Sequence, residues 1–153
     1  MLRTKIRDAL KAALKARNDR EVATVRLILA ALKDRDIAGR GAGAGGHEEI
    51  PDEEILNLLQ TMIKQRRDSI ALYEKGNRPD LVQQETEEIA VIQGFLPKQL
   101  SEKEMTEAVK ATIAAIGATS LKDMGRTMAA LKERYAGQMD FAKASGIVKQ
   151  QLG

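Results

Sequence analysis

Six basic residues near the C-terminus are of a type and spacing that could contact the phosphate backbone of a nucleic acid. They are Lys122, Arg126, Lys132, Arg134, Lys143 and Lys149. Lys122 and Arg126 are four residues apart, so a helix would place them on one face. Residues 98–153 carry nine basic and six acidic side chains. This excess fits phosphate binding, but it also fits an ordinary solvated surface.

A second group of cations, Lys64, Arg66 and Arg67, lies in the middle of an expected helix and allows two interpretations. One is an anion-binding patch. The other is an ion-pair network with the acids Glu85, Glu87 and Glu88 of the next expected helix. We favour the ion-pair network and keep the anion patch as the alternative.

A glycine-rich segment at residues 39–46 includes the pattern G-x-G-x-x-G at positions 41–46. In dinucleotide-binding proteins this pattern follows a strand and opens a helix directly. Here an expected helix precedes it and four residues separate it from the next, so we expect a flexible loop. His47 and the neighbouring acids could suggest a metal site, but acids are also favoured at a helix start by the helix dipole. We therefore predict no metal.

Composition removes most forms of catalysis. The chain has no cysteine and one histidine, which excludes disulfides, thiolate chemistry and zinc sites of the cysteine type. No Ser-Lys pair stands in a recognisable nucleophile turn. Aromatic residues make up only 3% of the chain, which argues against RNA binding by base stacking on a sheet. We assign no catalytic residue and no cofactor.

The elements that must position these side chains are helices. Apolar residues recur at helical spacing in seven segments, and no segment alternates with a period of two. We expect helices at about 2–17, 19–38, 51–75, 79–93, 102–116, 120–136 and 141–152, with stops at Gly76, Gly117 and Gly137. The fold class is therefore all-α.

The expected helices fall into two groups separated by a proline. Pro97 disfavours helical geometry at the preceding residue, and Ser101 with Glu104 forms the pattern of a capping box for a new helix. We predict an N-terminal helical domain at 1–97 with about four helices and a three-helix domain at 98–153, joined at a Pro-containing hinge. Phe95, Leu96 and Leu100 are expected to pack between the two parts.

Charge is distributed unevenly along the 153 residues. Residues 1–40 carry 11 basic and 5 acidic side chains, and residues 41–97 carry 5 basic and 11 acidic ones. Such complementary blocks could hold neighbouring helices together. No apolar run reaches the roughly 18 residues of a membrane span, and no secretory signal is visible. We expect a soluble, cytoplasmic protein with no membrane partner.

Three stretches together resemble a known family. They are residues 25–34, residues 63–70 continuing to Phe95-Leu96-Pro97, and residues 122–128 with the ending 148–152. In order and spacing they resemble the GatB/YqeY family, specifically its free-standing YqeY-like proteins, over essentially the whole chain. One position departs: Gln138 stands where the family often has arginine in the turn Gly-Arg-x-Asp.

The resemblance implies an indirect link to tRNA. Similar helical and tail domains form the C-terminal part of the B subunit of glutamine-dependent tRNA amidotransferases, which are carbon–nitrogen ligases with glutamine as amido donor. In that subunit a separate domain carries the chemistry and the tail helps to hold tRNA. The implied function is a tRNA-binding accessory module that does not catalyse amidation. The alternative is an adaptor that docks on an amidotransferase or an aminoacyl-tRNA synthetase.

Overall fold

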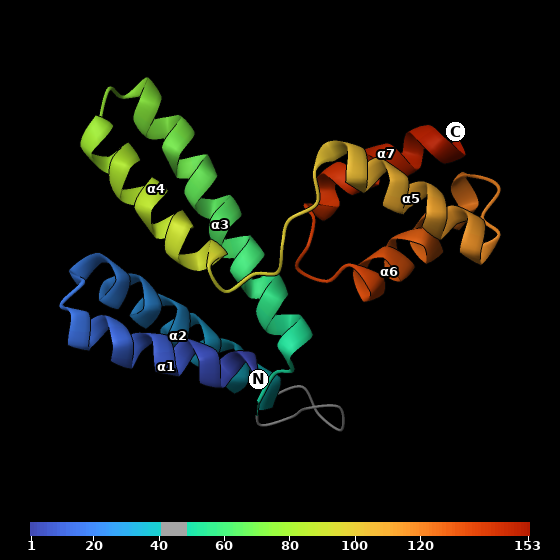
Figure 1. Cartoon of the computed structure of the whole chain (residues 1–153). Coiled ribbons are helices and arrows are strands. Elements are labelled where there is room, and N and C mark those ends of the chain that lie inside the picture. The colour runs from blue at the N-terminus through green and yellow to red at the C-terminus, as the bar shows by residue number, and fades with distance from the viewer. Residues whose placement is uncertain (41–48) are drawn as a thin grey trace. The chain divides into compact units, whose positions relative to one another are not determined.

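The computed structural model describes residues 1–40 and 49–153, and every regular element in them is helical (Figure 1). The expectation of an all-α fold is confirmed. The α-helices are α1 (Leu2–Ala16), α2 (Asp19–Arg40), α3 (Asp52–Lys75), α4 (Pro79–Gln93), α5 (Glu102–Ile116), α6 (Met124–Arg134) and α7 (Phe141–Leu152). The loop predicted at residues 39–46 begins too early, because α2 continues through Gly39 to Arg40. Residues 41–46 and the question of a metal site at His47 fall outside the described residues.

The chain divides into two units, Met1–Leu96 and Pro97–Gly153. In the first unit, α1 and α2 lie side by side, as do α3 and α4 (Figure 1). Their facing sides form a core of aliphatic residues that includes Ile6, Ile28, Leu32, Ile55, Leu59 and Ile92. In the second unit, α5, α6 and α7 enclose a separate core that includes Val109, Leu131, Met139, Ala144 and Val148.

The residues around the boundary belong to different cores. Phe95 is 8% exposed and lies in the core of the first unit, with Leu96 packed against the same cluster. The Phe95 amide donates to the Ile92 carbonyl oxygen (3.1 Å), which continues the last turn of α4. Leu100 instead packs on the second core, and its amide donates to the Gln138 carbonyl oxygen (2.8 Å). Phe95 and Leu96 thus contact the first core and Leu100 the second; the packing of these residues between the two units stays a prediction.

Several helix ends follow the signals in the sequence. Ser101 and Glu104 form the capping box of α5, and Gly117 ends that helix in the left-handed conformation (φ 68°). Gly76 does not adopt that conformation; the left-handed residue is the next one, Asn77 (φ 54°). The segment predicted as one helix from residue 120 begins with a 3-10 turn, Leu121–Asp123, before α6.

Candidate nucleic-acid interface

The six candidate cations of the second unit lie on the exposed sides of α6 and α7 and on the turn before α6. Lys122 lies in the 3-10 turn, Arg126, Lys132 and Arg134 lie on α6, and Lys143 and Lys149 lie on α7; all six are exposed. The opposite side of α6 is buried at Thr127 and Leu131. The amphipathic pattern of these helices thus leaves every candidate cation in contact with solvent.

The exposed cations do not converge on one point. Arg126 and Lys132 are six residues apart on α6, which places them roughly 120° apart around the helix axis. Lys143 and Lys149 are separated by the same interval on α7. The surface is therefore a set of dispersed positive charges, and such a set contacts an extended polyanion better than a single small anion.

Arg126 is held by the protein itself. Its Nη1 donates to the Ile116 carbonyl oxygen (2.8 Å), and its Nη2 donates to Asp123 Oδ1 (3.2 Å). Asp123 Oδ2 in turn accepts from the Thr119 amide (2.9 Å). This amide and, to a lesser extent, the Arg126 guanidinium hold the pKa of Asp123 below its usual value. Arg126 therefore joins the end of α5 to the start of α6, a role that the sequence analysis missed.

The other five candidates are electrostatically available. Within residues 1–40 and 49–153, no ion pair involves any of Lys122, Lys132, Arg134, Lys143 and Lys149. An exposed cation without a protein counter-charge can exchange its mobile counterions for phosphates at little cost. These five side chains form the candidate interface.

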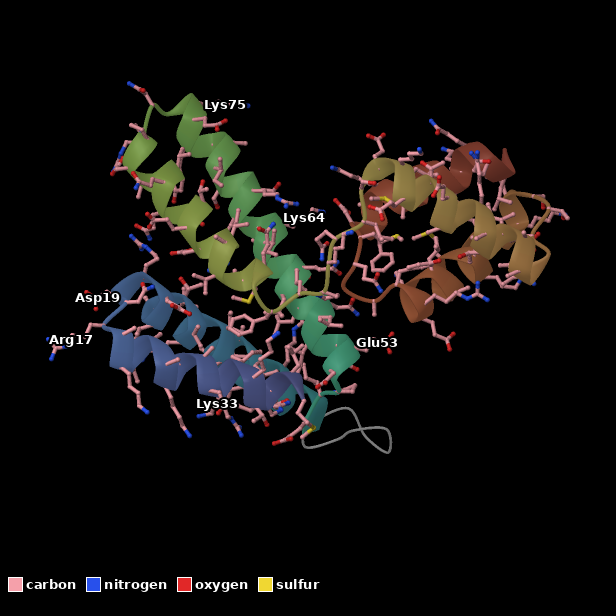
Figure 2. All side chains as sticks on the ribbon, viewed as in Figure 1. Arg17, Asp19, Lys33, Glu53, Lys64 and Lys75 are labelled. Atoms are coloured by element: carbon pink, nitrogen blue, oxygen red, sulfur yellow. The ribbon has the colours of Figure 1, made fainter. Side chains whose placement is uncertain are left out.

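The alternative anion patch on α3 is divided by the structure. Arg66 Nε donates to Glu88 Oε2 (2.8 Å), its Nη1 donates to the Met62 carbonyl oxygen (3.1 Å), and Glu85 lies 3.9 Å away. The ion-pair network between α3 and α4 is thus present, and it occupies Arg66. Lys64 and Arg67 remain exposed on α3; Lys64 is labelled in Figure 2.

Burial also raises the pKa of one carboxyl of this network. Glu85 lies against the ion pair, where desolvation and then the charge of Glu88 raise its pKa, and Arg66 opposes that rise. The position lies between two helices of the first unit rather than in a cleft. We therefore interpret it as a structural feature and not as an acid-base catalyst.

The acids near the start of α3 also have structural partners. Glu49 Oε2 lies 3.5 Å from Arg3 Nε, and Asp52 Oδ2 accepts from the Leu2 amide (3.2 Å). In the part of the chain that the structure describes, no group of three potential ligands could hold a metal ion. None of the described helices is long and apolar enough to cross a membrane.

Comparison with known proteins identifies the family. The family described as Yqey-like protein matches residues 3–152, nearly the entire chain. The chain belongs to the YqeY-like family.

Curated relatives of this YqeY-like chain carry the name "Altered inheritance of mitochondria protein 41, mitochondrial". The protein of Lachancea thermotolerans is 33% identical over 57% of this chain and 43% of its own length. That of Vanderwaltozyma polyspora is 31% identical over 57% of this chain and 44% of its own length. That of Saccharomyces cerevisiae (strain YJM789) is 28% identical over 70% of this chain and 56% of its own length. The chain thus spans about half the length of the curated relatives it matches.

The expectation of a cytoplasmic location is wrong on this comparison, because the names of the relatives describe them as mitochondrial. The expectation was based on the lack of a membrane span and of a secretory signal. These two features only indicate whether a protein is secreted or spans a membrane. They do not distinguish one aqueous compartment from another.

Proposed function

We propose that this YqeY-like chain is an accessory module that binds tRNA through the exposed cations of α6 and α7 and does not itself catalyse amidation. The observation that supports the proposal is the set of five exposed cations without an ion pair to any described residue. The resemblance to the tail of the amidotransferase B subunit adds tRNA as the class of RNA. The name of the relatives mentions no RNA. The proposal therefore depends on the exposed positive charges and on the resemblance to the amidotransferase B subunit.

Recognition through these side chains would depend on phosphates rather than bases. The two aromatic residues of the second unit, Tyr135 and Phe141, are partly buried against its core and are poorly placed for stacking on bases. Phosphate contacts position a nucleic acid and carry little sequence information. We therefore expect similar affinity for different tRNAs and a strong dependence on salt.

The test is a filter-binding titration of purified tRNA against the full chain at several salt concentrations. A few phosphate contacts should give a slope of log affinity against log salt of about −2 or steeper. The triple variant Lys132→Gln, Lys143→Gln, Lys149→Gln should reduce that slope by about 2. Arg126 is left unchanged, because its substitution would disturb the α5–α6 connection.

The control replaces three other exposed lysines of the same unit, as Lys98→Gln, Lys103→Gln, Lys110→Gln. Both triple variants lose the same net charge, so a difference between them reports the position of the charges. Absence of tRNA binding by the unmodified chain at low salt would overturn the proposal. RNase-resistant capture of an amidotransferase or an aminoacyl-tRNA synthetase would instead favour the adaptor function.

A further inference from the structure

The basic block of residues 1–40 is only partly neutralised by the acidic block that follows it. Two ion pairs join the blocks among the described residues: Arg3 with Glu49 (3.5 Å) and Arg20 with Glu87 (3.0 Å). Seven other cations of α1 and α2 are exposed and have no ion pair to a described residue: Lys5, Arg7, Lys11, Lys15, Arg26, Lys33 and Arg35. Charge complementarity within the chain therefore leaves most of the basic block available.

Four of these cations lie on one side of the α1–α2 hairpin. On α2, Thr24 is buried and Arg20 pairs with Glu87 of α4, so these residues mark the side turned toward α4. Arg26 and Lys33 are seven residues apart and share a different, exposed side. Figure 2 shows Lys33 on the side of the hairpin that faces away from α3 and α4.

The cations of α1 follow the same side. Leu2 is buried in the core of the first unit, so it marks the side of α1 that is turned toward that core. Arg7 and Lys11 are exposed and lie roughly 140° or more around the helix from Leu2. We call Arg7, Lys11, Arg26 and Lys33 the hairpin face.

The register of the hairpin places these side chains close together along its length. Arg3 and Asp36 form a two-bond ion pair, with Nη1–Oδ2 at 2.8 Å and Nη2–Oδ1 at 3.0 Å. In antiparallel helices this pair puts Arg7 level with about Lys33, and Arg26 between the levels of Lys11 and Lys15. Each four-residue step along α1 advances about 6 Å. The four cations of the hairpin face therefore form a short positive strip, about 10 Å long, on two neighbouring helices.

We propose that the hairpin face binds the phosphate backbone of a folded RNA. It would be a second contact surface, in addition to the cations of α6 and α7. The inference depends on the proposed function, because both surfaces would hold the same class of ligand. The helices α1 and α2 contain no aromatic residue, so the strip can contact phosphates but cannot stack on splayed bases. This restriction favours double-stranded, folded RNA, which proteins contact mostly through backbone and shape.

An anionic membrane surface is the less favoured partner for the same charges. Interfacial helices insert an apolar face into the bilayer, whereas the main apolar sides of α1 and α2 are buried in the core of the first unit. Leu14, Leu27 and Ile37 are about half exposed (48%, 47% and 52%), but Leu14 and Ile37 lie at opposite ends of the hairpin, about 18 Å apart along it. The experiment nevertheless includes anionic vesicles as a separate measurement.

The test uses the full chain, purified tRNA and a matched pair of triple variants. The test variant is Lys11→Gln, Arg26→Gln, Lys33→Gln; the control is Lys5→Gln, Arg35→Gln, Lys75→Gln. All six positions are exposed, both variants lose three charges, and Lys5 and Arg35 lie on the other side of the same two helices. The test variant should reduce the salt slope by about 2 and weaken binding at low salt at least tenfold, whereas the control should keep the slope of the unmodified chain.

The outcomes separate this inference from the proposed function. If the unmodified chain binds no tRNA, both fail. If it binds and the test variant behaves like the control, the hairpin face is not an RNA surface. The proposal for α6 and α7 is then decided by the triple variant of Lys132, Lys143 and Lys149. If the test variant loses binding and the α6–α7 variant does not, the hairpin face is the principal surface. Loss of binding to vesicles of phosphatidylglycerol without loss of tRNA binding would overturn the inference in favour of a lipid surface.

Discussion

Substitution of Arg66 by methionine should strongly destabilise the first unit. Arg66 and Glu88 are both largely buried, with side-chain exposures of 13% and 10%, and their 2.8 Å contact joins α3 to α4. Removing one partner of a buried pair leaves an uncompensated charge, which costs about 3–5 kcal/mol. Gln84 Nε2 also donates to Glu88 Oε1 (3.3 Å), but a neutral amide cannot replace the guanidinium.

Urea unfolding followed by circular dichroism measures this effect. With a slope of about 1–2 kcal/mol per molar urea for a unit of this size, the transition midpoint should fall by about 2 M. The double variant Arg66→Met, Glu88→Met should recover most of the loss, because replacement of a buried pair by apolar residues is often neutral or stabilising. Arg67→Met, which alters an exposed neighbour on the same helix, should change stability by less than about 0.5 kcal/mol.

The deficit of the Arg66→Met variant should also depend on pH. Burial raises the pKa of Glu85, so its protonated form is favoured in the folded state, and its contribution to stability is lost as the pH rises through that raised pKa. Arg66 opposes the rise, so its removal raises the pKa of Glu85 further. The variant should therefore lose more stability at pH 7 than at pH 4. A loss below about 1 kcal/mol at pH 7, or a double variant as unstable as the single one, would refute this reasoning.

Five further substitutions, at four positions, test local features by the same unfolding measurement. Asp140→Ala removes the carboxylate that accepts two amide hydrogen bonds at the start of α7 and should cost about 1 kcal/mol, whereas Asp140→Asn should cost little. Gly146→Ala should stabilise α7 by about 1 kcal/mol because nothing lies near the added methyl group, whereas Gly117→Ala should destabilise because its φ of 68° disfavours a side chain. Phe95→Ala should cost about 3 kcal/mol or more by leaving a cavity in the first core; a loss below about 1 kcal/mol would contradict its assigned burial.

Helix positions in this chain could be predicted because their signals are local. The apolar stripes, the Ser101–Glu104 capping box and Asp140 each act within one or two turns, and the structure reproduces them. α3 ends at Lys75 with Gly76 as its cap, as predicted, but the residue in the left-handed conformation is Asn77 rather than Gly76. Among residues other than glycine, asparagine is one of those that adopt the left-handed region most often. Composition alone therefore could not choose between two adjacent candidates.

The packing of Phe95 and Leu100 could not be predicted from their apolar character. Both are apolar residues near Pro97, and both were expected to pack between the two parts of the chain. What decides their cores is hydrogen bonding of the backbone: the Phe95 amide continues α4, and the Leu100 amide bonds to Gln138, 38 residues later. The second bond depends on the turn before α7, which no local pattern near Leu100 indicates.

The candidate binding surfaces show that ion pairing, too, could not be predicted from the sequence alone. The sequence shows that residues 1–40 are basic and that residues 41–97 are acidic, and mutual neutralisation was a natural interpretation. Neutralisation requires that the charged sides of the helices face each other. In the folded unit the core occupies the facing sides, and only Arg3 and Arg20 reach acids of the following block among the described residues. The spacing of Arg7 and Lys11 is readable from the sequence, but their place beside Arg26 and Lys33 depends on the Arg3–Asp36 pair, which sets the register of the hairpin. The net charges of two segments therefore overestimate the number of ion pairs between them when the facing sides of their helices are apolar. The charged side chains then lie on the outer sides and contact solvent.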